Sequence, residues 1–180
     1  VSLELLSAAR VLAEKRKTEV SAVLLGHGIE ALTDLLLAHG ADQVFLADDP
    51  ALEKYLTLPY TRVIAHLIGQ KRPEIFLLPA TSLGSDLAAR VAMRVNTGLS
   101  AHCTNLDIND RGELMQVVPA FGGKVMATIL CQKRRPQMAT VRPGVFRKRE
   151  PHEGRGTIER FPAELEPGEL SQKVLEIHRE

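Results

Sequence analysis

Residues 74–95, with the sequence EIFLLPATSLGSDLAARVAMRV, contain the pattern on which the fold of this protein depends. The apolar run at residues 75–78 has the length of a buried strand, and a proline ends it. Residues 84–95 place apolar side chains at helical spacing. Three small hydroxyl residues, Thr81, Ser82 and Ser85, lie at the junction of the two segments. The stretch therefore predicts a strand that leads through a short loop into a helix, the repeating unit of α/β folds.

The same alternation precedes this stretch. Short apolar runs at residues 20–25 and 44–47 predict two more buried strands. The periodicity of the apolar side chains predicts helices over residues 2–17, 29–38 and 60–70. Short strands that alternate with amphipathic helices imply parallel strands joined by right-handed crossovers.

The pattern changes after Gly98. Residues 99–108 predict a single strand, and a turn follows at residues 109–112. Strand-like segments flank a Phe-Gly-Gly turn and predict a β-hairpin, and one more short strand comes later; these segments are residues 113–120, 124–130 and 138–142. The second half of the chain is therefore expected to be rich in β structure.

Together these patterns predict an α/β fold class: a mostly parallel, Rossmann-like sheet flanked by helices, with a β-hairpin-rich C-terminal half. We expect residues 1–146 to form the α/β domain and residues 147–180 to form an exposed loop and terminal strands. Residues 147–156, RKREPHEGRG, combine charges with glycine and proline, which is typical of an exposed loop. Residues 157–161 and 170–178 could each add a strand.

The composition argues against several classes of protein. The formal net charge is +1 and aromatic residues make up 4%, so we predict no nucleic-acid binding, and we expect the basic runs at 133–135 and 147–149 to be solvated turns. Two cysteines without a C-x-x-C motif predict no disulfide scaffold and a reducing, cytoplasmic compartment. No apolar run approaches the ~20 residues that span a bilayer, so no membrane span is predicted.

The loop within residues 79–90 admits two interpretations. Its hydroxyl oxygens can cap the following helix by accepting hydrogen bonds from backbone N–H groups. The same N–H groups, with the helix dipole, can bind phosphate, and the carboxyl ends of parallel strands are the usual ligand edge. The loop has neither the lysine of a Walker loop nor the G-x-G-x-x-G pattern. The residues alone therefore favour capping.

Other polar groups give weaker indications. The Gly-His-Gly turn at residues 26–28 could admit a ligand to the backbone, but a tight turn between strand and helix requires these glycines equally and is the better interpretation. His102 and Cys103 are adjacent on a predicted strand and point to opposite faces, so we predict no metal site there. Arg142 precedes a Pro-Gly stop, where it could bind a carboxylate or phosphate or form an ordinary ion pair. The residues favour neither reading of Arg142.

The sequence contains no evident catalytic constellation. It offers no nucleophile–base pair, no pair of carboxylates and no metal-ligand cluster. We therefore predict no catalytic residues and a protein that is not an enzyme.

Two longer stretches resemble a known family in register. Residues 79–108, PATSLGSDLAARVAMRVNTGLSAHCTNLDI, and residues 119–146, PAFGGKVMATILCQKRRPQMATVRPGVF, are similar to the N-terminal domain of electron transfer flavoprotein alpha subunits. Residues 81–90 resemble the T-x-x-G-x-D-L-A-x-R element of that family. Residues 135–144, RPQMATVRPG, resemble the form found in anaerobes, including bifurcating types.

The resemblance implies an electron carrier that works as a heterodimer with a beta subunit of similar fold. It would carry electrons through FAD between acyl-CoA dehydrogenase-type partners and other redox proteins, with this domain docking the beta subunit. The main FAD site of the family lies in a C-terminal domain, which we expect to be missing here together with the first strand. The beta subunit is expected to hold AMP or a second FAD. Candidate contacts to a flavin or nucleotide across the interface are Arg142, Thr81, Ser82, Gly84 and Ser85.

An alternative function belongs to another class. The loop within residues 79–90 is also compatible with a stand-alone adenine-nucleotide-binding module or small enzyme, on an α/β sheet of the adenine nucleotide alpha hydrolase-like type. Binding of AMP or ATP by the isolated chain would favour this alternative.

Overall fold

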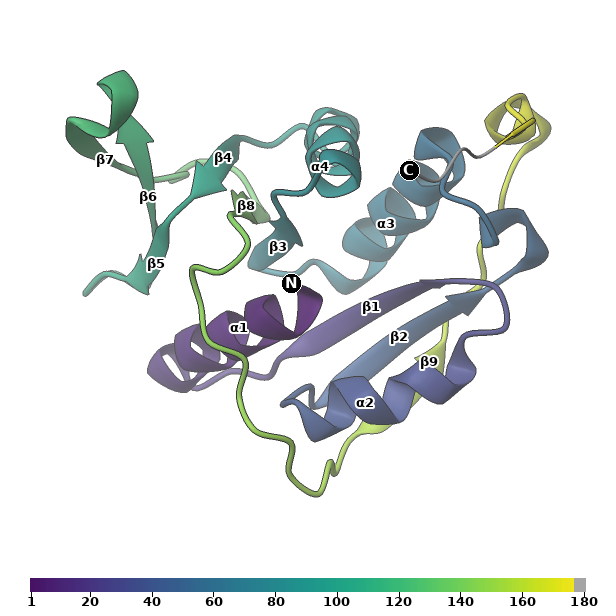
Figure 1. The fold of residues 1–180 in the computed structure, drawn as a ribbon, viewed down its shortest axis with the longest axis horizontal. Coiled ribbons are helices and arrows are strands. Elements are labelled where there is room, and N and C mark those ends of the chain that lie inside the picture. Colours follow the sequence, from purple (N-terminus) through teal and green to yellow (C-terminus); the bar gives the residue numbers. More distant parts are fainter. Residues whose placement is uncertain (177–180) are drawn as a thin grey trace.

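The strands of the computed structural model, which describes residues 1–176, form two parallel sheets and one antiparallel sheet (Figure 1). The first sheet has the order β1 (Ser21–Gly26), β2 (Gln43–Asp48), β9 (Thr157–Arg160). The second has the order β3 (Ile75–Pro79), β8 (Gln137–Val141), β4 (Leu99–Cys103). The third is an antiparallel meander of β5 (Asn105–Ile108), β6 (Leu114–Ala120) and β7 (Val125–Ile129).

Four α-helices accompany the sheets within the described residues. They are α1 (Ser2–Arg16), α2 (Thr33–Ala38), α3 (Thr57–Lys71) and α4 (Ser82–Arg94). Short 3-10 turns complete the chain: η1 (Glu30–Leu32), η2 (Pro50–Leu52), η3 (Phe121–Gly123) and η4 (Pro167–Leu170). The predicted fold class, parallel strands flanked by helices with a β-rich second half, is confirmed.

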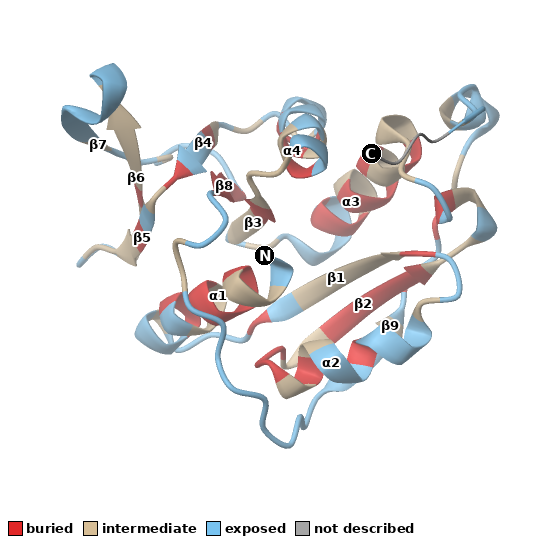
Figure 2. Cartoon of the chain, in the orientation of Figure 1, coloured by how far each residue is buried: buried red, intermediate tan, exposed pale blue. Residues whose placement is uncertain are grey.

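Helices α1 and α3 connect the two parallel sheets. Leu6 of α1 packs with Val44 of β2 in the first sheet, and Leu12 packs with Val141 of β8 in the second. Helix α3 does the same with other residues, because its Leu67 belongs to the cluster around β2 and its neighbour Ile68 to the cluster around β8 and α4. The central strands β2 and β8 are the most buried, as Figure 2 shows. The core is thus divided between the sheets and joined through these helices.

The predicted single strand at residues 99–108 is wrong in one respect, because it is two strands in two different sheets. A bulge interrupts the pairing of β4 with β8 between Ser100 and Cys103. His102 lies within it at a φ of 58°, which is rare for a residue with a side chain. The bend directs the chain out of the parallel sheet, and β5 then pairs with β6.

Two other predicted elements differ from the structure. The predicted helix at residues 29–38 begins as the 3-10 turn η1 and becomes α-helical only in α2. The predicted strand at residues 170–178 is absent from residues 171–176, and residues 177 and 178 lie outside the described residues.

The segment at residues 147–156 places β9 beside β2. It crosses α1 and α2 on its way (Figure 1), with Arg149 N–H donating to Ser7 Oγ at 2.9 Å and His152 N–H donating to the Ala38 carbonyl at 2.9 Å. A Cβ at Gly156 would lie 2.5 Å from the Asp42 carbonyl oxygen, so this approach requires a residue without a side chain.

Within residues 1–176, no helix has both the length and the apolar composition needed to cross a membrane.

Candidate functional site

The carboxyl edge of the second sheet brings three loops together. Strands β3, β8 and β4 are parallel, so their carboxyl ends meet at one edge. Ala80 N–H, just after β3, donates to the Val141 carbonyl at 2.7 Å. Arg142 N–H, just after β8, donates to the Cys103 carbonyl at 3.0 Å. These two bonds hold the start of α4, the Arg142 loop and the end of β4 next to one another.

The loop that contains Thr81 and Ser82 caps α4, which is the interpretation that the sequence favoured. Thr81 is the N-cap residue, and its Oγ1 accepts a hydrogen bond from Gly84 N–H at 3.1 Å. Its carbonyl accepts from Ser85 N–H at 2.8 Å. The side chain of Ser82 is exposed and that of Ser85 is half-buried, and neither hydroxyl has a partner within residues 1–176.

Gly84 is explained by packing. A Cβ at this residue would lie 2.0 Å from the Pro79 carbonyl oxygen, a distance that no side chain tolerates. The glycine therefore lets the first turn of α4 rest directly on the end of β3. Its candidate role toward a flavin or nucleotide stays a prediction.

Arg142 is exposed, and its guanidinium has no ion pair or hydrogen bond within the described part of the chain. The ion-pair interpretation left open for Arg142 is therefore not realised there. A guanidinium offers several N–H donors in a planar fork suited to carboxylate, phosphate or carbonyl oxygens. Together with the positive end of the α4 dipole, it makes this edge a favourable place for an anionic or electron-rich group.

His102 is a neighbour of this edge that sequence reasoning did not select. The bulge turns its ring to solvent, while its N–H donates to Thr140 Oγ1 at 2.9 Å. Its left-handed backbone conformation costs on the order of 1 kcal/mol, and such positions gather at functional sites. No signal in the sequence marks a bulge here, because it depends on pairing with a strand more than 30 residues further along the chain.

The aspartate of the residue 81–90 motif has a structural role. Asp86 accepts hydrogen bonds from Thr57 Oγ1 at 2.6 Å and from the Tyr55 hydroxyl at 2.7 Å. These bonds lower the pKa of Asp86, with that from Thr57 contributing most. Burial, with the nearby Asp86 carboxylate, raises the pKa of Tyr55 to about 12. The contacts tie the start of α3 to the first turns of α4, beside the candidate site.

The Gly-His-Gly turn after β1 is occupied by a side chain of the protein itself. Asp48, the last residue of β2, accepts hydrogen bonds from Gly28 N–H at 2.8 Å and Ile29 N–H at 3.1 Å. The bond from Gly28 is the main cause that lowers the pKa of Asp48. Since an internal carboxylate already uses these donors, the turn is a structural feature, as the sequence favoured.

The two cysteines are both unpaired. Cys103 is fully buried in the core, and burial raises the pKa of its thiol to about 11. Cys131 is half-buried in the loop before β8. No group of three or more histidine, cysteine, aspartate or glutamate side chains among residues 1–176 is placed to hold a metal ion.

These features define the class of the protein: an α/β protein whose parallel strands end in serine hydroxyls, a helix N-terminus and an arginine without a side-chain partner among residues 1–176. The chain belongs to the electron transfer flavoprotein domain family, whose model matches residues 1–166. The resemblance read from residues 79–108 and 119–146 is thereby confirmed.

Named relatives agree with the family. The chain is 45% identical to an electron transfer flavoprotein subunit alpha from Thermoanaerobacterium thermosaccharolyticum, over 100% of this chain and 55% of the relative. It is 47% identical to a protein FixB from Clostridium saccharobutylicum, over 98% of this chain and 53% of the relative. It is 39% identical to an acryloyl-CoA reductase electron transfer subunit beta from Anaerotignum propionicum, over 82% of this chain and 46% of the relative. The chain thus spans about half the length of these relatives.

Proposed function

We propose that this chain is the α/β part of an electron transfer flavoprotein alpha subunit that is not itself an enzyme. In this proposal the subunit associates with a beta-type subunit and carries electrons through FAD between acyl-CoA dehydrogenase-type partners and other redox proteins. The observation that carries the proposal is the family match over residues 1–166 together with 45% identity to a named alpha subunit along the whole chain. Residues 1–146 would form the domain that docks the beta-type subunit. Residues 147–180 would lead toward a C-terminal domain that contains the main FAD site.

The edge around Arg142 fits the flavin group that the family implies. A bound flavin supplies the exchange of electrons, and the protein tunes it through nearby charges and hydrogen bonds. The guanidinium of Arg142, which has no side-chain partner within residues 1–176, would donate to an electron-rich oxygen or nitrogen atom, and the hydroxyls of Ser82 and Ser85 would donate to oxygen atoms. A positive charge at this place would favour the reduced state and so raise the reduction potential.

The flavin so contacted would be held mainly by the beta-type subunit, where AMP is the alternative occupant. Thr81 would act through its cap on α4, and Gly84 through its contact with β3, by setting the position of the α4 N-terminus. Substitution of Thr81 or Gly84 would therefore move the backbone. Substitution of Arg142 would remove its contact with the flavin and leave the backbone in place.

The test uses the full-length protein purified together with its beta-type subunit. Flavin content and the reduction potential of each bound flavin are measured for the wild type and for Arg142→Gln. We expect a lower potential for one flavin in Arg142→Gln, at an unchanged melting temperature. The matched control is Arg72→Gln, because Arg72 is also exposed and without a side-chain partner in the described chain, but precedes β3 at the opposite edge. Unchanged potentials in Arg142→Gln would remove Arg142 from the proposed site.

The alternative of a stand-alone adenine-nucleotide-binding module rests on the same loop. Isothermal calorimetry of the full-length protein without its partner, with AMP and then ATP, separates the two functions. Heat of binding that Ser82→Ala and Arg142→Gln reduce would favour the alternative, and no association with a beta-type subunit would overturn the leading proposal.

A further inference from the structure

His102 has a backbone conformation that is rare inside a strand. Its φ of 58° lies in the left-handed region that favours glycine. The other non-glycine residues with a positive φ in residues 1–176 lie at helix ends or in turns and loops: Lys17, Arg72, Asn96, Phe121 and Glu164. Among the described residues, His102 is therefore the one case in which a strand holds a side chain in this conformation.

The bulge in β4 explains the conformation but not the side chain. Ser100 pairs with Ala139 and Cys103 pairs with Val141, so that residues 101 and 102 together lie opposite Thr140. This extra residue turns the chain out of the parallel sheet, and a glycine would allow the same turn without strain. The imidazole of His102 thus needs a reason other than the path of the backbone.

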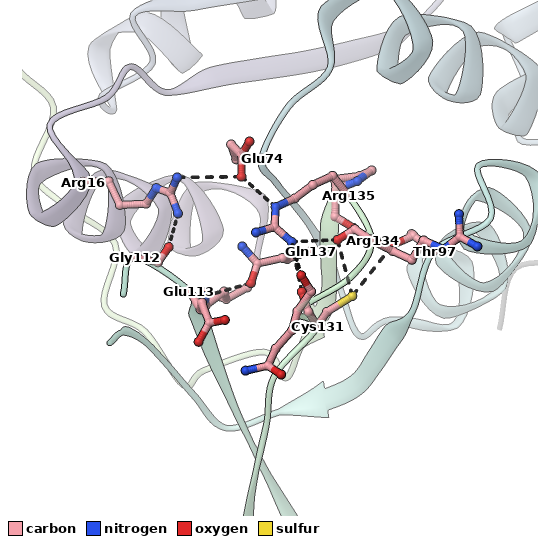
Figure 3. A network of polar contacts seen from close by, with 12 residues as sticks. Arg16, Glu74, Thr97, Gly112, Glu113, Cys131, Arg134, Arg135 and Gln137 are labelled. Atoms are coloured by element: carbon pink, nitrogen blue, oxygen red, sulfur yellow. Dashed lines mark hydrogen bonds and ion pairs between the residues drawn. The ribbon is translucent and has the colours of Figure 1, made fainter. Parts of the chain in front are cut away.

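The surrounding strands fix the bulge in place. Thr140 is fully buried, and its Oγ1 accepts the hydrogen bond from His102 N–H at 2.9 Å. At the other end of β8, the buried amide oxygen of Gln137 accepts from Leu114 N–H at 2.9 Å, within the polar network that Figure 3 shows. Strained residues persist where the structure around them leaves no alternative, and a side chain held in this way loses less entropy when it binds a ligand.

The bulge places His102 beside Arg142 at the carboxyl edge of the second sheet. Cys103, the next residue in the chain, accepts a hydrogen bond from Arg142 N–H at 3.0 Å through its carbonyl. The side chains of His102 and Arg142 are both exposed, and neither has an ion pair or hydrogen bond within the described residues. An imidazole carries at least one N–H donor in every protonation state. Two side chains with free donors therefore flank a single backbone hydrogen bond at this edge.

We propose that His102 is a second contact residue of the flavin site that contains Arg142. Its imidazole donates a hydrogen bond to a polar atom of the same group that the Arg142 guanidinium contacts. The inference rests on the proposed function, because it adds a residue to the site named there. A donated hydrogen bond favours the electron-rich, reduced form of the group, so His102 and Arg142 act in the same direction. The strain at His102 is then stability given up for a donor in a fixed position.

The experiment measures the melting temperature and the flavin reduction potentials of the full-length protein with its beta-type subunit. His102→Gly removes the ring and relieves the backbone, so we expect a melting temperature about 1–2 °C higher. We expect a lower potential for the flavin that Arg142→Gln affects, equivalent to about fivefold weaker relative binding of its reduced form. His102→Asn should keep most of the wild-type potential, because asparagine tolerates the left-handed region and its amide donates a hydrogen bond.

Lys17→Gly is the matched control for the relief of strain. Lys17 is exposed with a φ of 55° at the end of α1, and it precedes β1 at the opposite, amino edge of the parallel strands. The change should also raise the melting temperature, and every flavin potential should stay at its wild-type value.

Three results would overturn the inference. These are wild-type potentials in His102→Gly, a fall in potential that accompanies a fall in melting temperature, and a potential in His102→Asn as low as in His102→Gly. The second result would mean that His102 acts through the fold, and the third that no donated hydrogen bond is involved.

Arg142→Gln separates failure of this inference from failure of the proposed function. If Arg142→Gln lowers one potential and His102→Gly lowers none, the proposed site stands without His102. If neither variant changes a potential, the proposed flavin site at this edge is wrong, and the inference falls with it.

Discussion

Gly84 rests directly on Pro79, so that a Cβ at residue 84 would lie 2.0 Å from the Pro79 carbonyl oxygen. This contact joins the first turn of α4 to the end of β3 and sets where the helix N-terminus points. The glycine thus supports the candidate site through backbone packing, whether or not a ligand approaches it.

Replacement of Gly84 by alanine is expected to destabilise the protein by about 2 kcal/mol, because the added methyl group forces α4 away from β3. The control is Gly69→Ala in α3, where an added Cβ meets nothing within 4 Å. That change should stabilise the protein by up to about 1 kcal/mol, since alanine favours the helix over glycine. Urea denaturation measures both. Equal effects at the two positions would contradict the packing role.

Two arginines are expected to differ in their contribution to stability. Arg135→Gln should cost about 1 kcal/mol, because Glu74 and the carbonyls of the loop before β8 lose a shared donor. Arg142→Gln should change the free energy of unfolding by less than about 0.5 kcal/mol, since the guanidinium is exposed and has no partner in the described residues. Thermal unfolding of both variants gives the comparison, and a large loss at Arg142 would mean that its role is structural.

Asp48 is expected to contribute to acid sensitivity. Its folded-state pKa is lowered below 3.8, mainly by the hydrogen bond from Gly28 N–H, so the unfolded chain binds the proton more tightly than the folded one. The resulting stability is fully present above pH 3.8 and is lost as the pH falls through the lowered pKa. Urea denaturation at a series of pH values across this range gives the free energy of unfolding. It should depend less on pH for Asp48→Asn than for the wild type.

The control for the loss of stability at low pH is Asp110→Asn, because Asp110 is exposed in a turn and its carboxylate has no hydrogen bond within residues 1–176. The free energy of unfolding of this variant should depend on pH as in the wild type. If Asp48→Asn lost stability at low pH as the wild type does, the Gly-His-Gly turn would not depend on the Asp48 carboxylate.

Tyr55 is expected to titrate at unusually high pH. Burial, with Asp86, raises its pKa from 10.0 to about 12, so its contribution to stability is present below pH 10 and is lost as the pH rises toward 12. Asp86→Asn removes the negative charge and should lower this pKa, as followed by ultraviolet absorbance of the phenolate. The only other tyrosine, Tyr60, donates to the Leu52 carbonyl and serves as an internal control. Two unchanged transitions would contradict the contact between Tyr55 and Asp86.

Much of the local structure could be predicted because it depends on neighbours in the sequence. The cap at Thr81 and the strand before it follow from residue type and spacing over a few positions, and the structure has both. Arg142 could be selected as a candidate because a Pro-Gly stop follows it, but its lack of an ion pair could not be read from the sequence. Asp48 and Asp86 escaped selection because their hydrogen-bond partners lie about 20 or more residues away.

The sequence by itself determined the elements, the alternation that makes them an α/β fold, and the motifs that mark the family. The tertiary structure alone decided that β8 lies between β3 and β4, that residues 99–108 divide between two sheets, and that β7 at the end of the third sheet exposes its apolar side chains. The physical reason is that periodicity and capping act within one or two turns of chain. Strand order, bulges and exposure depend instead on which distant segments compete to bury the same surface.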